Sequence, residues 1–158
     1  MTSFRLVSVN DGNLKEYLNL FHALFPKDSH TTDPAKVTDY ERWIVTVDDA
    51  AAGICGLYGL KGHAGDKWMD WYGILPEQRG HGLGGAVLDA MIEQAAGARL
   101  LLWTTVMELE GTRLEAFYSA RGFIKTPWEL EYNHSPVFTF HRGEGRDVRT
   151  LDPLDWLH

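Results

Sequence analysis

The segment of residues 76–85 constrains the fold of this chain most strongly, because it holds four glycines within six residues. Gly80, Gly82, Gly84 and Gly85 lie between a predicted strand and a predicted helix. Glycine lets the backbone come close to a ligand, and the first N–H groups of a helix have no partners within the helix. Their partial positive charge suits a phosphate or pyrophosphate. The segment therefore predicts a phosphate-binding loop; the alternative is a turn that only brings strand and helix together.

The elements around this loop predict one α/β domain. A helix over residues 83–97 and a strand over residues 100–105 form a crossover with the strand before the loop. That strand, residues 67–75, closes an antiparallel meander with strands 42–47 and 53–60. The other expected elements are a strand at 4–9, a helix from Leu14 to Pro26, a short helix opening at Pro34, a helix at 110–120 and strands at 123–132 and 137–142.

The resulting order is β-α-α-β-β-β-α-β-α-β-β, a mixed and mostly antiparallel sheet flanked by helices. At 158 residues the chain has room for one domain, which we place at residues 1–142 and follow with a C-terminal tail, residues 143–158.

Composition narrows the range of partners. Asp and Glu outnumber Lys and Arg by 22 to 15, so nucleic acid and anionic membranes are disfavoured. Cys55 is the single cysteine, which excludes an intrachain disulfide and a paired-cysteine zinc site. The histidines show no metal-ligand spacing, so we expect no metal. No apolar run reaches the ~18 residues of a membrane span, and we expect a cytoplasmic protein.

Two phosphate-binding schemes fit the loop poorly. Gly80, Gly82 and Gly85 match the G-x-G-x-x-G dinucleotide fingerprint, but four residues, 76–79, separate the strand from the first glycine. The antiparallel meander before the loop also differs from the repeated βα units of a dinucleotide fold. The nucleotide-triphosphate loop requires Gly-Lys-Ser/Thr, which does not follow here.

A third scheme fits better. Arg79-Gly80-His81-Gly82-Leu83-Gly84 matches the arginine-or-glutamine, x, x, glycine, x, glycine-or-alanine loop of GNAT N-acetyltransferases, and Pro-Glu precedes it. Residues 116–123, Ala-Phe-Tyr-Ser-Ala-Arg-Gly-Phe, are similar to the second signature of that superfamily, a tyrosine-bearing helix that ends at Gly-Phe. The chain therefore resembles the GNAT superfamily. It departs from many relatives at Glu110-Gly111-Thr112, where they have an asparagine that contacts the pantetheine arm.

The resemblance implies a site for acetyl-CoA as acyl donor. Loop amides would bind the CoA pyrophosphate, the strand end would offer backbone groups to pantetheine, and the thioester would lie between this strand and residues 101–104. The implied cofactor-binding residues are Ile74, Leu75, Arg79, Gly80, His81, Gly82, Leu83, Gly84, Gly85 and Tyr118.

The implied catalytic residues are an acid and a base. By resemblance Tyr118 donates a proton to the departing thiolate, because a phenol of pKa about 10 is protonated at neutral pH; otherwise it is a core tyrosine. Asp70 and Glu108 are candidate bases for the incoming amine, and each is equally interpretable as an ordinary ion-paired or solvated carboxylate. The aromatic residues near the proposed site either line an acceptor pocket or belong to the core; they are Trp68, Trp71, Tyr72 and Trp103.

The expected function is transfer of an acetyl group from acetyl-CoA to a primary amine of a small molecule or peptide, by direct attack in a ternary complex. Acidic residues near the acceptor side favour a cationic amine; they are Asp28, Asp33, Asp39 and Glu41. The rivals are a noncatalytic acyl-CoA-binding or sensing domain and a nucleotide-dependent oxidoreductase. A homodimer is a further expectation, since relatives often form one.

Overall fold

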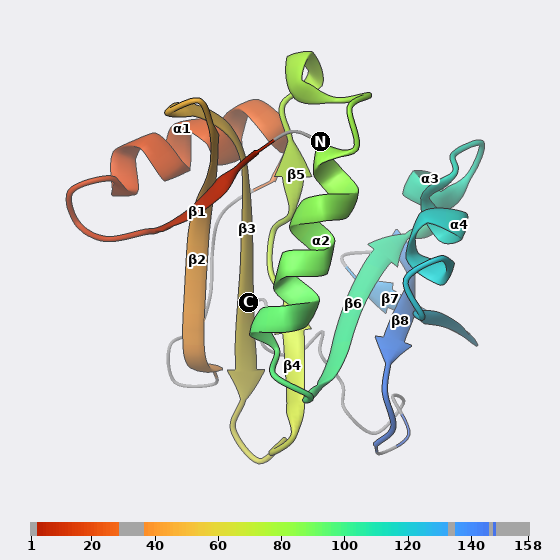
Figure 1. Ribbon diagram of the computed structural model, residues 1–158. Coiled ribbons are helices and arrows are strands. Elements are labelled where there is room, and N and C mark those ends of the chain that lie inside the picture. The colour runs from red at the N-terminus through yellow and green to blue at the C-terminus, as the bar shows by residue number, and fades with distance from the viewer. Residues whose placement is uncertain (1–2, 29–36, 133–134, 146, 148–158) are drawn as a thin grey trace.

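The computed structural model describes residues 3–28, 37–132, 135–145 and 147. An eight-stranded sheet has the order β1-β2-β3-β4-β6-β8-β7, and β5 also pairs with β3 (Figure 1). The strands are β1 (Arg5–Ser8), β2 (Val37–Val47), β3 (Ala50–Leu60), β4 (Asp66–Met69), β5 (Gly73–Ile74), β6 (Arg99–Thr105), β7 (Ile124–Tyr132) and β8 (Ser135–Arg142). The helices are α1 (Leu14–Leu24), the 3-10 helix η1 (Pro76–Gln78), α2 (Leu83–Gln94), α3 (Val106–Leu109) and α4 (Leu114–Ser119).

The predicted class is confirmed, because the sheet is mostly antiparallel, β4 and β6 are parallel, and helices flank it. The predicted order of elements matches in outline. The helix expected at Pro34 and most of the expected tail, residues 143–158, lie outside the described residues.

The first hairpin follows its turn residues. Asp48 and Asp49 connect β2 to β3 with φ of 51° and 63°. Two consecutive positive φ angles give the tight turn whose twist suits antiparallel strands. The predicted hairpin is confirmed, although both strands are longer than expected.

The predicted single strand over residues 67–75 is wrong in one respect: it is interrupted at residues 70–72. Leu57 pairs with Met69, and Ile54 pairs with Gly73. Between these pairs β3 advances by three residues while the β4–β5 segment advances by four, which defines a one-residue bulge. Asp70 lies at the start of this bulge.

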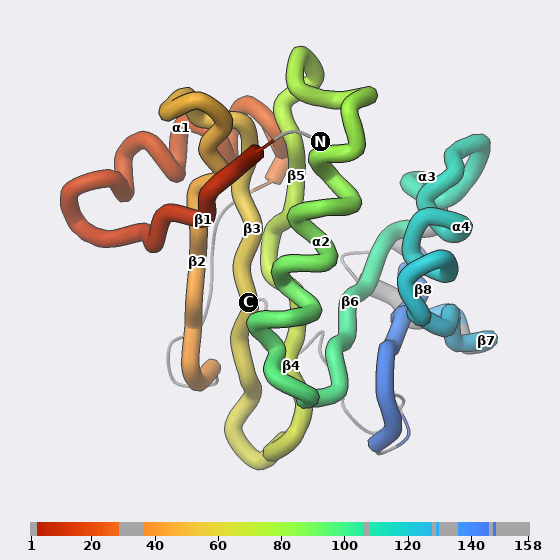
Figure 2. The backbone as a smooth tube through the Cα atoms, viewed as in Figure 1, coloured from red at the N-terminus to blue at the C-terminus, as the bar shows by residue number. Residues whose placement is uncertain are grey.

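β4 and β6 separate after a short parallel contact. Their pairing runs from Asp66 with Arg99 to Trp68 with Leu101. Beyond that point β5 stays on β3 while β6 continues on β8. The backbone trace shows β5 and β6 diverging on either side of α2 (Figure 2). Backbone groups in this region are thus removed from the ladder between the two halves of the sheet.

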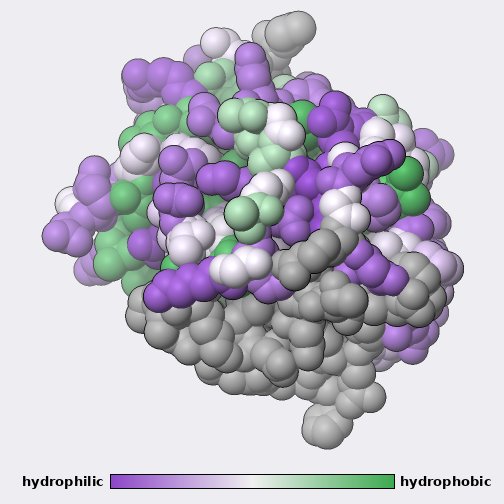
Figure 3. Space-filling view, turned by 90° about the horizontal axis from the view of Figure 1, so that it is seen from below, coloured by the Kyte–Doolittle hydropathy of each residue, from purple (hydrophilic) through white to green (hydrophobic). Residues whose placement is uncertain are grey.

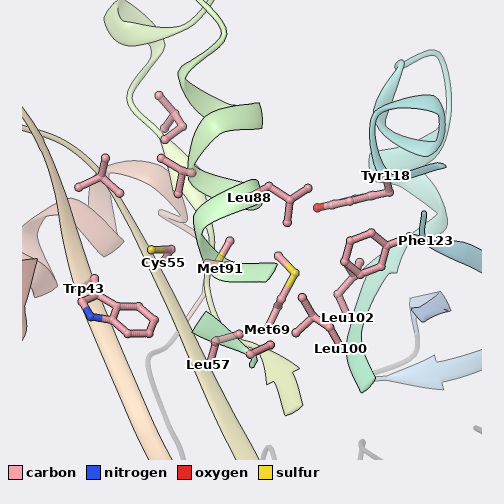
Figure 4. Close-up of a cluster of buried hydrophobic side chains, with 14 of the residues drawn as sticks. Trp43, Cys55, Leu57, Met69, Leu88, Met91, Leu100, Leu102, Tyr118 and Phe123 are labelled. Atoms are coloured by element: carbon pink, nitrogen blue, oxygen red, sulfur yellow. The ribbon is translucent and has the colours of Figure 1, made fainter. Parts of the chain in front are cut away.

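Helices pack on both faces of the sheet. On α1, Tyr17, Leu20 and Phe21 are buried against Ile44 and Ile54. On the opposite face α2 buries an apolar stripe against β3, β4 and β6, and Tyr118 and Phe123 complete this cluster (Figure 4). The stripe consists of Leu83, Val87, Leu88 and Met91.

The predicted helix over residues 110–120 is wrong at its start: α4 begins only at Leu114, and a separate short helix, α3, precedes residue 110. α3 ends at Leu109, and Gly111 adopts φ of 65°, which breaks the helical path. The Thr112 hydroxyl donates to the Glu108 carbonyl at 2.8 Å and so caps the end of α3. α4 then starts at Leu114.

The described surface gives no sign of a membrane span. Within residues 3–28, 37–132 and 135–145, no helix has the length and apolar character needed to cross a bilayer. Hydrophilic residues cover much of the described surface seen from below the sheet (Figure 3).

Candidate functional site

The glycine loop joins β5 to α2 through η1. Gly80 and Gly82 have φ of 85° and 79°, and an added Cβ would meet nothing within 4 Å at either position. Glycine is therefore required there by backbone conformation and not by lack of space. Gly82 is also the N-cap of α2, so no side chain at that position covers the first N–H groups of the helix. Residues 79–82 are exposed, which leaves this helix start accessible to an anion.

Arg79 turns away from the open end of the loop. Its Nε donates to the carbonyl oxygen of Ile74 at 2.8 Å. The N–H of Leu75 donates to Ala52 at 2.8 Å, and the Leu75 carbonyl accepts from Gln78 at 2.9 Å. The backbone groups expected to receive pantetheine at Ile74 and Leu75 thus already have protein partners. His81 is exposed in the loop.

Tyr72 fixes the first turn of α2. Its hydroxyl donates a short hydrogen bond to the carbonyl oxygen of Gly84. An added Cβ at Gly84 would lie 3.1 Å from that hydroxyl, so the small residue admits the contact. Sequence reasoning considered Tyr72 only as part of an aromatic wall, because a contact across twelve residues leaves no local pattern.

Tyr118 on α4 is 6% exposed and packs among aromatic rings, with centroids 5.3 Å from Phe140 and 5.8 Å from Phe123. Its hydroxyl points from α4 toward Leu88 on α2 (Figure 4). Burial, with a smaller contribution from the Glu108 carboxylate, raises the pKa of Tyr118 well above its ordinary value. The phenol therefore stays protonated at physiological pH and can act as a proton donor.

Asp70 lies in the bulge, half-buried near the Tyr40 side chain. The Tyr40 hydroxyl donates to Asp70 Oδ2 at 2.7 Å, and the Asp70 N–H donates to Gly56 at 2.9 Å. An added Cβ at Gly56 would lie 3.1 Å from the Asp70 Cβ, so glycine permits this approach. Burial raises the pKa of Asp70 to about 6, although the Tyr40 hydrogen bond and the Arg42 charge oppose the rise.

Glu108 has a structural role in the turn after β6. Its Oε2 accepts from the Thr104 hydroxyl at 2.7 Å and from the Thr105 N–H at 3.1 Å. The Thr105 hydroxyl accepts from the Glu108 N–H at 3.2 Å, which completes a capping box at the start of α3. The Thr-x-x-Glu spacing is a sequence signal for this cap that the function-directed interpretation missed.

Of the acidic residues expected at the acceptor side, Asp28 lies near the other candidate base, Glu108. Asp28 is close enough to Glu108 for that charge to raise its pKa, after the larger effect of burial. Asp39 and Glu41 lie exposed on β2, and Asp33 is outside the described residues.

The tryptophans near the proposed site differ in burial, and Trp68 belongs to the core. Trp68 is fully buried, and Trp71 packs on α1 with its ring 5.0 Å from Phe21 and 4.8 Å from Phe25. Trp103 is half-buried beside the cluster that contains Trp68.

No trio of His, Cys, Asp or Glu side chains in the described part of the chain is arranged to hold a metal ion. The candidate site thus consists of the glycine loop, the divergent strands, Tyr118 on one face of the sheet and Asp70 on the other.

Comparison with known proteins gives a consistent result. The family model described as "Acetyltransferase (GNAT) family" matches residues 14–123. No curated protein matches the sequence significantly.

Among solved structures, Escherichia coli ElaA aligns with a TM-score of 0.70 at 15% identity, over 90% of this chain and all of ElaA (100%). Arabidopsis thaliana Naa50, solved with the bisubstrate analogue CoA-Ac-MVNAL, has a TM-score of 0.70 at 18% identity over 90% and 99% of the two chains. A GNAT family acetyltransferase from Elizabethkingia anophelis with acetyl-CoA bound has a TM-score of 0.65 at 14% identity over 89% and 98%. These likenesses show a common fold.

Proposed function

The chain belongs to the GNAT acetyltransferase family, and on this premise we propose that it transfers an acetyl group from acetyl-CoA to a primary amine of a small molecule or peptide. The observation that carries the proposal is the uncapped, exposed start of α2 at Gly82, next to strands that diverge beyond the β4–β6 contact. The buried Tyr118, whose hydroxyl points toward Leu88 farther along α2, supports the proposal as a candidate proton donor.

The glycine loop fits the coenzyme diphosphate. Backbone N–H groups over residues 79–85 supply donors at the positive end of a twelve-residue helix. Acetyl-CoA supplies the activated thioester. Tyr72 holds Gly84 in position, and Arg79 holds the end of β5 through Ile74, so both side chains preorganise the loop.

Tyr118 is the proposed acid. Because its pKa is raised, Tyr118 retains its proton until a thiolate leaves. Ring contacts with Phe123 and Phe140 hold the side chain in place. Direct attack by the amine needs no nucleophile on the enzyme, so the chain's own task is to orient the partners and move two protons.

Asp70 is the proposed base in preference to Glu108. Glu108 uses its carboxylate to cap α3. The Asp70 carboxylate caps no helix and accepts from the Tyr40 hydroxyl and the Trp71 backbone. A carboxyl with a pKa of about 6 is mostly ionised at pH 7, so it can accept the proton that the amine nitrogen loses once that nitrogen has bonded to the thioester carbonyl carbon. It lies on the face opposite Tyr118, so acid and base approach the break in the sheet from its two sides.

A thiol-release assay tests the proposal. Acetyl-CoA is offered with amines, polyamines, amino acids, aminoglycosides and peptides, and Tyr118→Phe is compared with the unaltered protein. We expect the variant to lose about 100-fold or more in kcat while its Kd for CoA stays within about twofold. Val7→Ala, at an exposed position on the edge strand β1, is the control. CoA binding without turnover on any acceptor would instead support the noncatalytic sensing role.

A further inference from the structure

Arg121 connects α4 to α2 beside the glycine loop. Its Nε lies 3.1 Å from Asp89 Oδ1 on α2, and its guanidinium lies 4.7 Å above the Phe117 ring on α4. An added Cβ at Gly85 would overlap this guanidinium, so Arg121 lies directly against the backbone of Gly85 in the first turn of α2. A glycine at 85 is what allows the cation to reach that position.

The surroundings leave Arg121 room to move. Its side chain is 26% exposed and that of Asp89 is 63% exposed, which makes the ion pair a weak one. A cavity of about 680 Å³ adjoins it, and Arg121, Asp89, Glu93 and Arg142 contribute to its lining. The guanidinium can therefore exchange its carboxylate partner without any rearrangement of the core.

The backbone of Arg121 links the same residue to the proposed acid. The Arg121 N–H donates to the Tyr118 carbonyl oxygen at 3.0 Å at the end of α4. Arg121 thus belongs to the same terminal turn as Tyr118. Arg79, the other arginine near the loop, has its Nε committed to Ile74.

We propose that Arg121 is a binding residue for the coenzyme diphosphate, and that it pairs with Asp89 while no coenzyme is bound. The inference rests on the proposed function. On binding, the guanidinium exchanges the Asp89 carboxylate for a phosphate oxygen next to Gly85. Arginine is suited to this exchange because its planar fork pairs with carboxylate and phosphate alike.

Isothermal titration with CoA and with pantetheine, which lacks the diphosphate, tests the proposal. Arg121→Met should weaken CoA binding about tenfold and leave pantetheine binding unchanged, because a charge-assisted phosphate contact is lost. Arg121→Lys should restore part of the loss. Asp89→Asn should tighten CoA binding about two- to fivefold by removing the competing carboxylate, and this gain should vanish in the Arg121→Met background.

The control is Arg5→Met, which removes a more exposed arginine that pairs with Asp49 at the β1–β2 side of the sheet. It should not change CoA affinity. Equal CoA affinity for Arg121→Met and the unaltered protein would overturn the inference, as would an equal loss for CoA and pantetheine, which indicates a purely structural arginine. If the unaltered protein binds no CoA, the proposed function itself fails. Should Arg121→Met not fold, Asp89→Asn decides alone, and unchanged CoA affinity in that variant overturns the inference.

Discussion

Asp70, the proposed base, illustrates how burial changes the pKa of an ordinary carboxyl. Its folded-state pKa of about 6 lies above the 3.8 of an unperturbed aspartate, chiefly because the site is desolvated. The folded state therefore holds this proton more tightly than the unfolded chain does. Asp70 favours folding most below pH 3.8, and this contribution is lost as the pH rises through about 6.

Replacing Asp70 by Asn should remove this pH dependence. At each pH, the free energy of unfolding of Asp70→Asn is compared with that of the unaltered protein. We expect this change to be more favourable at pH 8 than at pH 4 by about 1 to 3 kcal/mol. Urea denaturation at the two pH values measures the difference. Asp39→Asn, at an exposed position on the neighbouring β2, is the control and should show little change. A stability difference that is the same at both pH values would contradict the assignment.

Some of the site residues could be predicted from the sequence, whereas the contacts that they make could not. Tyr118 and the loop glycines were identified from motifs, because their spacing along the chain is short and fixed by local geometry. The Tyr40 partner of Asp70 lies thirty residues away, and its contact depends on the register of β2 against β3. Arg121 was part of a recognised motif, but its contact with Gly85 depends on how α4 approaches α2. Such contacts leave no periodic signal.

At the level of elements, β5 depends on a close approach to β3. An added Cβ at Gly53 would overlap the carbonyl oxygen of Gly73 and lie 3.0 Å from Ile74 Cδ1. Since the obstacle includes backbone, a side chain there must push the strands apart. Ile74 and the glycine loop follow directly from this strand, so its displacement also moves the loop.

Gly53→Ala should therefore lower the free energy of unfolding by about 1 to 3 kcal/mol and also weaken CoA binding. Chemical denaturation and calorimetric titration measure the two effects. Gly12→Ala is the matched control, because its added Cβ would meet only the flexible Asn10 side chain, 3.1 Å away. An unchanged stability for Gly53→Ala would show that β5 is not pressed against β3.

Periodicity predicted the long elements well and the interrupted ones poorly. The stripe of α2 and the hairpin turn at Asp48 and Asp49 have strong local signals, and both were found. The bulge at residues 70–72 and the break between α3 and α4 were missed. In each case a short apolar pattern runs on, while Asp70 or Gly111 changes the backbone path through contacts or a positive φ.

At the scale of the whole molecule, the sheet has two halves that meet along the short β4–β6 contact. The strands that bear Asp70 and the loop belong to one half, and β6, β8 and β7, with α3 and α4 attached to this side, belong to the other. The β4–β6 contact is where the two halves of the sheet meet before they diverge, so its strength sets how firmly the proposed acid and the proposed base are held relative to each other. The order of elements in the sequence predicted this crossover, but not where the pairing ends.

A buried ion pair secures the β4–β6 contact. Arg99 Nε and Nη2 donate to the two carboxylate oxygens of Asp66 at 2.8 and 2.9 Å, and the side chains are 3% and 8% exposed. The pair joins the first residues of β6 and β4, which are also opposite each other in the parallel register. Removing one partner of such a pair leaves the other charge buried without its main compensation.

Asp66→Ala should accordingly lower the free energy of unfolding by about 3 kcal/mol, and catalytic activity should fall more steeply with temperature than in the unaltered protein. Urea denaturation and the temperature dependence of thiol release measure the two effects. Glu115→Ala is the matched control: it removes a carboxylate from a more exposed pair with Lys125, 3.4 Å apart, and should cost less than about 1 kcal/mol. If both variants lower the free energy of unfolding by the same small amount, the ion pair does not hold the two halves of the sheet together. The apolar core across β4 and β6 then does so.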